Sequence, residues 1–152
     1  MRGVSLDIEK MHVLQIDPGE DVLECVKQFL KDQEIEQAVV TGGFGTLAAY
    51  HLHWVKHNRL PTENVFAAGE DGIEILAMNG MVTDGDPHIH VTLSTQNGAF
   101  GGHLENGCIA YVLCEIFFAE VSGKTVHNRT VPIEIEEMGK GKYIKLVVDE
   151  EE

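Results

Sequence analysis

Short strand-like segments divided by tight turns make up most of this chain of 152 residues. Turn-forming triplets such as Gln96-Asn97-Gly98 and Glu105-Asn106-Gly107 separate apolar or alternating runs, which is the pattern of antiparallel strands joined by reversals. We expect strands at residues 10–16, 37–40, 47–54, 61–67, 72–82, 88–95, 99–104, 107–121, 130–137 and 142–148. So many closely spaced strands leave room for few helices and predict a mostly antiparallel sheet.

One segment has a helical pattern instead. Asp17 suits the N-cap of a helix and Pro18 its first position, so a helix is expected over about residues 18–33. Its apolar stripe, at helical spacing, consists of Val22, Leu23, Val26, Phe29 and Leu30. One amphipathic helix among many strands predicts the α+β class. Because no linker, repeat or low-complexity stretch is found, we expect a single domain over residues 1–152 with an acidic tail at 149–152.

The segment 41–46, Thr-Gly-Gly-Phe-Gly-Thr, is rich in glycine and follows a short expected strand. A phosphate-binding loop would continue into Gly-Lys-Ser or Gly-Lys-Thr and then a helical stripe, and this segment does neither. We therefore expect it to connect two strands, or to bring the backbone close to a site.

Acidic residues outnumber basic residues by 25 to 11, which gives the chain a formal net charge of -14. Proteins bind nucleic acids mainly through lysine and arginine side chains that neutralise phosphates, and no basic run occurs here, so direct DNA binding is not favoured. An acidic surface also repels anionic membranes. The N-terminal residues lack the long apolar stretch of a secretory signal, so we expect a cytoplasmic protein with reduced cysteines.

Three histidines give the clearest chemical signal. His88 and His90 are one residue apart on an expected strand, so their side chains project from the same face. The turn at 96–98 would fold the next strand back and bring His103 beside the pair. Three imidazoles with an open fourth position are typical of a reactive zinc centre. The alternative is that these are ordinary surface or core histidines, and spacing alone does not decide between the two.

Two further features bear on that site. A second pair, His51 and His53, has the same spacing but lacks a glycine-framed third histidine, which favours the first pair as metal ligands. Glu115 stands alone in the apolar segment 108–118, where a carboxylate is costly unless it is paired or ligating. Glu115 can serve as a fourth ligand or as a proton-transfer group beside a metal. Its alternative role is a structural bond to a buried arginine, histidine or backbone amide.

The chain resembles the prokaryotic, stand-alone branch of the PPC (plant and prokaryote conserved) domain family over about residues 10–136. The stretches that carry the resemblance are Gly19-Glu20-Asp21, Thr41-Gly42-Gly43-Phe44-Gly45, Ile73-Glu74-Ile75-Leu76, His88-Ile89-His90, Gly101-Gly102-His103-Leu104 and Glu115. The Gly-Gly-His-Leu element with an upstream His-x-His is specific to the prokaryotic branch. The resemblance implies a barrel-like α+β fold similar to that of acetolactate decarboxylase, a homotrimer, and zinc held by the three histidines.

Two classes of function follow. If zinc is bound, we expect a metal-dependent hydrolase or lyase acting on a small oxo or ester compound, with Glu115 as the proton shuttle. A zinc ion with a purely structural role is the milder alternative. Family members are also commonly labelled predicted DNA-binding proteins, which implies a DNA-binding, regulatory or assembly module, although the Arg-Gly-Arg-Pro AT-hook of the plant proteins is missing from this sequence.

Overall fold

The structure, a computed structural model, describes residues 1–149 of the chain. Among these residues, eight strands and one helix follow one another in an order close to the prediction. They are β1 (Asp7–Gln15), α1 (Val22–Asp32), β2 (Ala38–Val55), β3 (Asn64–Thr83), β4 (Asp86–Thr95), β5 (Gly98–Leu104), β6 (Ile109–Ser122), β7 (Val126–Ile135) and β8 (Gly139–Val148).

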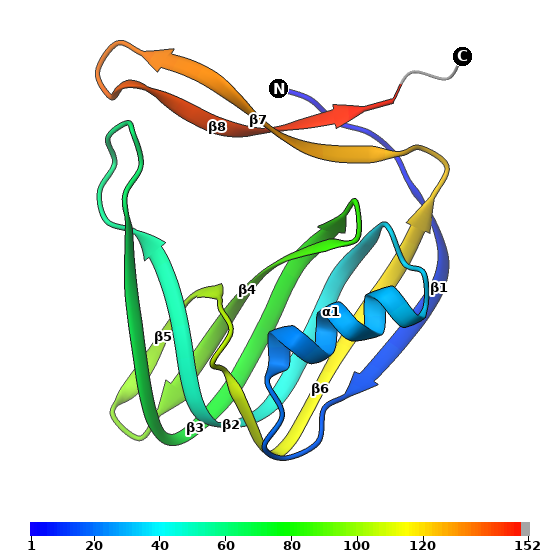
Figure 1. Cartoon of the computed structure of the whole chain (residues 1–152), viewed down its shortest axis with the longest axis vertical. Helices are drawn as coiled ribbons and strands as arrows, with labels where there is room; N and C mark the ends of the chain where they lie inside the picture. Colours follow the sequence, from blue (N-terminus) through cyan, green and yellow to red (C-terminus); the bar gives the residue numbers. More distant parts are fainter. Residues whose placement is uncertain (150–152) are drawn as a thin grey trace.

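Within the described residues, six strands form one antiparallel sheet in the order β1-β6-β2-β3-β4-β5. The last strand, β5, also pairs with β2, through Leu104 with Leu52 and His103 with His53. Strands β2 to β5 therefore form a closed, barrel-like unit, and β6 and β1 extend the sheet beyond β2 (Figure 1). The predicted α+β class and mostly antiparallel sheet are confirmed.

Helix α1 lies across one face of the sheet (Figure 1). It buries one stripe, and the ring of its Phe29 lies 5.7 Å from that of Phe118 on β6. The buried helical residues are Val22, Leu23, Val26 and Leu30, as the apolar spacing predicts. Within residues 1–149, no helix has the length and apolar composition needed to cross a membrane.

The helix begins later than predicted. Asp21, and not Asp17, is the N-cap, and its carboxylate accepts hydrogen bonds from two backbone N–H groups of the first turn. The backbone carbonyl of Asp17 instead accepts a hydrogen bond from the backbone N–H of Glu20 in a turn, at 3.2 Å. Gly19, with a φ of 92°, and a β-bridge from Asp21 to Ile109 keep this stretch out of the helix. Asp17 and Asp21 can each cap a helix, and the bridge to Ile109 beside β6 selects Asp21.

The glycine-rich segment 41–46 does not connect two strands, and that prediction was wrong. It lies inside β2, which joins the expected strands 37–40 and 47–54 into one. Gly45 explains the pattern, because a Cβ at this position would lie 2.0 Å from the carbonyl oxygen of Leu113 on β6. Its φ of 140° is also in a range that side chains rarely adopt. Glycine here lets two strands approach closely and bends β2.

Strands β7 and β8 form a separate hairpin that crosses one end of the barrel-like unit (Figure 1). The open end of the hairpin, where β7 begins, is bonded to the β3–β4 turn. There Nη1 of Arg129 donates to Oδ2 of Asp84 at 2.7 Å. His127 bonds to both Asp84 and Asp149. Arg129 and His127 lower the pKa of the Asp84 carboxyl, and the hydrogen bonds to Asp149 and Asp84 raise the pKa of His127.

The tip of the β7–β8 hairpin is bonded to the β2–β3 turn. There the backbone N–H of Leu60, in the β2–β3 turn, donates to the carbonyl of Met138 at 2.7 Å. Gly141 on β8 lies against Leu60 as well, since a Cβ at Gly141 would be 3.0 Å from the Leu60 side chain. The hairpin is thus held at both ends as a cover over one end of the barrel-like unit.

Candidate metal centre

Four histidines meet on the outer face of the barrel-like unit. His88 and His90 lie on β4, His103 on β5 and His53 on β2. Side chains alternate between the two faces of a strand, so the neighbours of these histidines point into the core. The buried neighbours are Ile89, Val91, Leu104 and Leu52, each 3% exposed or less.

Strand register places three of these histidines in one row. His90 is the direct partner of His103 across β4 and β5, and His103 is the direct partner of His53 across β5 and β2. Directly opposed residues of antiparallel strands have Cβ atoms about 4.5–5.5 Å apart. His88 lies on the same face of β4, two residues nearer to the β3–β4 turn.

The four rings lie close to one another. The Nε2 atoms of His88 and His90 are 3.2 Å apart. The ring of His103 stacks on that of His53 with centroids 4.4 Å apart, and it lies 4.6 Å from His88 and 5.7 Å from His90. The structure therefore brings the three predicted histidines together and adds a fourth.

Glu105, just after β5, faces two of these rings. Its Oε1 lies 2.5 Å from Nδ1 of His53 and 3.3 Å from Nδ1 of His103. Its backbone N–H donates to the carbonyl of His51 at 3.1 Å, which holds the residue beside β2. A carboxylate bonded to Nδ1 fixes the ring and leaves Nε2 of the same ring available to a cation.

His53, His103 and Glu105 form a possible metal site, since each offers a ligand atom within 4.8 Å of the other two. Imidazole nitrogens and carboxylate oxygens are zinc ligands. Nδ1 of His103 is buried and has no hydrogen-bond partner among the described residues. A buried polar atom without a partner is costly, and a bound ion or ligand can satisfy it.

His88 and His90 also fit a cation. Tetrahedral zinc with Zn–N bonds of about 2.0–2.1 Å holds two ligand nitrogens roughly 3.3 Å apart, close to the 3.2 Å between these Nε2 atoms. Burial lowers the pKa of His88, and the neighbouring imidazoles of His90 and His53 lower it further. Burial and His88 also lower the pKa of His103. Both rings are therefore neutral near pH 7, the form that binds metals.

His53 and Glu105 are the two members of the cluster that were not predicted from the sequence. The lack of a glycine-framed histidine after His51 and His53 favours the other pair as ligands, but the strand partner of His53 is the glycine-framed His103 itself. A Cβ at Gly102 would lie 2.7 Å from the carbonyl oxygen of His53, so this glycine allows β5 to approach β2. His51 bonds instead to the backbone carbonyl of Asn106, at 2.7 Å.

Glu115 lies elsewhere on the sheet. It is half-buried on β6, where its direct partners are Gln15 on β1 and Phe44 on β2. Phe44 is nine residues from His53 along β2, and within residues 1–149 no hydrogen bond or ion pair joins Glu115 to the histidines. Its role in proton transfer stays a prediction, whereas Glu105 is the carboxylate in contact with the cluster.

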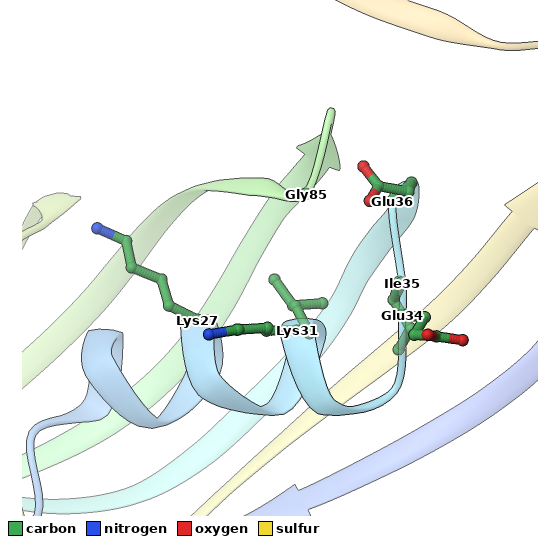
Figure 2. A pocket seen from close by; sticks show the side chains of 7 residues that line it. Lys27, Lys31, Glu34, Ile35, Glu36 and Gly85 are labelled. Carbon is green, nitrogen blue, oxygen red and sulfur yellow. The ribbon is translucent and has the colours of Figure 1, made fainter.

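A different cavity, of about 500 Å³, lies between the C-terminal end of α1 and the β3–β4 turn. Figure 2 shows the Lys27 and Lys31 side chains at one end and the carboxylates of Glu34 and Glu36 at the other. Its lining has no histidine or cysteine. The histidine cluster is therefore the better candidate for a metal centre.

The sequence profile of the Plants and Prokaryotes Conserved (PCC) domain matches residues 4–122, which include the histidine cluster. The chain belongs to this family. The Gly-Gly-His-Leu and His-x-His elements predict membership of this same family, and the profile match confirms that prediction. The "Bifunctional protein GlmU" of Synechococcus sp. (strain JA-2-3B'a(2-13)) is 28% identical over 112 residues, which cover 73% of this PCC-domain chain and 17% of that protein.

Solved structures share the fold. The metal-containing protein AF0104 from Archaeoglobus fulgidus matches with a TM-score of 0.73 and 23% identity, over 95% of this chain and 100% of the other. A candidate DNA-binding protein from Bacteroides thetaiotaomicron matches with a TM-score of 0.66 and 16% identity, over 91% and 96%. A protein from Staphylococcus aureus similar to alpha-acetolactate decarboxylase matches with a TM-score of 0.50 and 16% identity, over 77% and 53%. The predicted similarity to the acetolactate decarboxylase fold is confirmed.

Replacing Glu105 by glutamine tests its place in the cluster. Glu105→Gln keeps the size of the side chain but removes the charge that faces Nδ1 of His53 and His103. We expect the affinity for zinc to fall about 10- to 100-fold, which is typical when an outer carboxylate partner of ligating histidines is lost. Competition with a fluorescent zinc chelator measures it. Glu74→Gln, on the exposed part of β3, is the control, and equal affinities of the two variants would contradict this role.

Proposed function

We propose that this PCC-domain protein binds one zinc ion at the histidine cluster and acts as a metal-dependent hydrolase or lyase on a small molecule. The observation that carries the proposal is the convergence of four imidazoles and one carboxylate from three different strands and the loop after β5. The metal-containing archaeal neighbour and the neighbour similar to alpha-acetolactate decarboxylase support it.

We assign the ligands as His88, His90 and His103, with Glu105 and His53 as their support. Oε1 of Glu105 lies 3.3 Å from Nδ1 of His103, so in this assignment the opposite ring nitrogen, Nε2, binds the zinc and Nδ1 faces the carboxylate. Glu105 is also bonded to His53, which stacks on His103 and holds its plane. A zinc ion, when bound, would polarise a carbonyl group or lower the pKa of a bound water to about 7.

The rival ligand set is His53, His103 and Glu105, which the interatomic distances also allow. The two assignments share only His103. They differ in the expected effect of removing His88, which is a ligand in the first set and absent from the second. They also differ in the acid–base chemistry available, because only in the first set does Glu105 stay free to accept a proton.

A homotrimer is the second part of the proposal. The outer face of β1, β6 and β2 exposes apolar side chains that no other described element covers. Met11 and Val13 are 55% and 61% exposed, and Phe44, at 44%, packs against Phe117 in a tilted arrangement with ring centroids 5.9 Å apart. We infer that further copies of the chain cover this face, as the family resemblance implies. Glu115, the strand partner of Phe44, lies on the same face and would be covered by the neighbouring copy.

A DNA-binding role is the alternative that the Bacteroides neighbour suggests. The net charge of -14 opposes it, since phosphate contacts require clustered lysine and arginine side chains. The two functions therefore differ in a measurable way, namely in how binding responds to salt.

Zinc content is the first test of the proposal. Protein purified without a histidine tag and dialysed after exposure to zinc should hold one zinc per chain by mass spectrometry of metals, and should hydrolyse 4-nitrophenyl acetate faster than metal-free protein. His88→Ala and His103→Ala should each lose zinc. His57→Ala, in the β2–β3 turn, is the matched control and should keep it. A wild-type protein without zinc would refute the metal centre, and retention by His88→Ala alone would favour the rival ligand set.

Light scattering after size exclusion tests the trimer. Wild-type protein should elute at three times the chain mass of 16.8 kDa, and Val13→Lys should shift it toward the mass of one chain, because a lysine there would be buried at the contact. Val55→Lys is the control, since Val55 is similarly exposed, at 58%, at the end of β2. A wild-type monomer would contradict the assembly.

A fluorescence titration with duplex DNA at several salt concentrations tests the alternative. We expect no binding at low salt, because the acidic surface repels phosphates. Binding that weakens steeply as salt rises would instead support phosphate contacts and a DNA-binding module.

A further inference from the structure

A cavity of about 380 Å³ lies between the β3–β4 turn and the β7–β8 hairpin, next to the histidine cluster. His88 belongs both to this cavity and to the cluster. The lining residues are Thr83, Asp84, Asp86, His88, Asn128, Thr130 and Ile144. The cavity thus joins the candidate metal centre to the hairpin that covers the end of the barrel-like unit.

We propose that this cavity is the recognition half of the site and that it binds a small ligand carrying an ammonium group beside hydroxyl groups. The inference rests on the proposed function, because it assigns the class of ligand that would be presented to the metal. It adds three residues to the site: Asp86 for the ammonium group, and Asn128 and Thr130 for the hydroxyl groups.

The charges in the cavity favour a cation. Asp84 is neutralised by Arg129 and His127, so it contributes little net charge. Asp86 is exposed, and within residues 1–149 its carboxylate has no ion pair or side-chain hydrogen bond. Asp86 also lies two residues from His88 on the same face of β4. An unpaired carboxylate at this position attracts an ammonium group and repels phosphate or carboxylate ligands.

The hairpin supplies the polar groups on the other side. Asn128 and Thr130 alternate along β7, so both face the cavity, and the intervening Arg129 is used to hold Asp84. An amide and a hydroxyl can each donate and accept a hydrogen bond, which suits a ligand with hydroxyl groups. Ile144 on β8 adds the apolar surface. The hairpin lies beyond residues 4–122, the part of the chain that matches the family profile.

The length of the arrangement suits a small molecule. Two residues along a strand span about 6.6 Å, so Asp86 is roughly that far from His88 along β4. A ligand of a few heavy atoms can therefore place its ammonium group at Asp86 and a hydroxyl or carbonyl oxygen near the histidines. The two positive charges, of ligand and metal, then stay apart on either side of His88.

Serinol and glycerol form a matched pair of probes, because serinol carries an ammonium group where glycerol carries its central hydroxyl. We would titrate each into the zinc-treated protein of residues 1–152 at pH 7 and follow backbone amide shifts of Asp86, Asn128 and Thr130 by NMR. Serinol should bind saturably and about tenfold more tightly than glycerol, since a charge-assisted hydrogen bond is roughly twice as strong as a neutral one.

Variants give the second arm of the test. Asp86→Asn keeps the shape of the side chain and should reduce serinol binding to the level of glycerol, while Asn128→Ala should weaken both probes. Asp71→Asn makes the same chemical change on β3, twelve residues from Thr83, and should leave both probes unaffected. Equal binding of serinol and glycerol to wild type, no saturable binding of either, or an Asp86→Asn variant that binds serinol normally would overturn the inference.

The failure of this inference is distinguishable from the failure of the metal centre. Zinc content of the same samples is measured in parallel with the titrations. Zinc bound with the expected dependence on His103, together with no preference for serinol, would overturn the recognition half alone. Serinol binding at Asp86 without any zinc would leave the cavity assigned and overturn the metal centre.

Discussion

The pairing of β5 with β2 is the contact on which the rest of the structure depends. It consists of two residue pairs, Leu52 with Leu104 and His53 with His103. The leucine pair points inward and closes the core, and the histidine pair points outward and forms part of the histidine cluster. The leucines are both fully buried, and the histidines stack on the outer face. Gly102 permits the contact, because any side chain there would meet the His53 carbonyl. Barrel closure and site assembly are therefore one event.

A site on the outer face of a barrel is open to water, and chemistry at a metal benefits from a covered environment. The chain offers two covers. The β7–β8 hairpin lies over the end at which His88 is placed, and it is held there by the Asp84, His127 and Arg129 contacts. The second is the proposed assembly, in which copies of the chain would cover the exposed apolar face of β1, β6 and β2. The histidines lie within residues 4–122, which match the family profile, and the hairpin follows this range.

Local features were predictable from the sequence, and contacts between distant segments were not. The β4–β5 hairpin follows from the turn at 96–98, so the neighbourhood of His88, His90 and His103 could be foreseen. His53 is fifty residues from its partner His103, and the local sequence around either histidine does not indicate that the two pair. The same reason explains the helix cap, where a bridge to Ile109 selects Asp21, and the segment 41–46, whose glycines serve a close contact with β6.

An anomalous difference map at the zinc absorption edge, from crystals grown without added chelator, would show whether zinc binds at the histidine cluster and through which residues. We predict one peak about 2.0–2.1 Å from imidazole nitrogens of His88, His90 and His103, with Glu105 outside the coordination sphere. Rings that turn apart around an empty centre, or a peak bound by other residues, would contradict it.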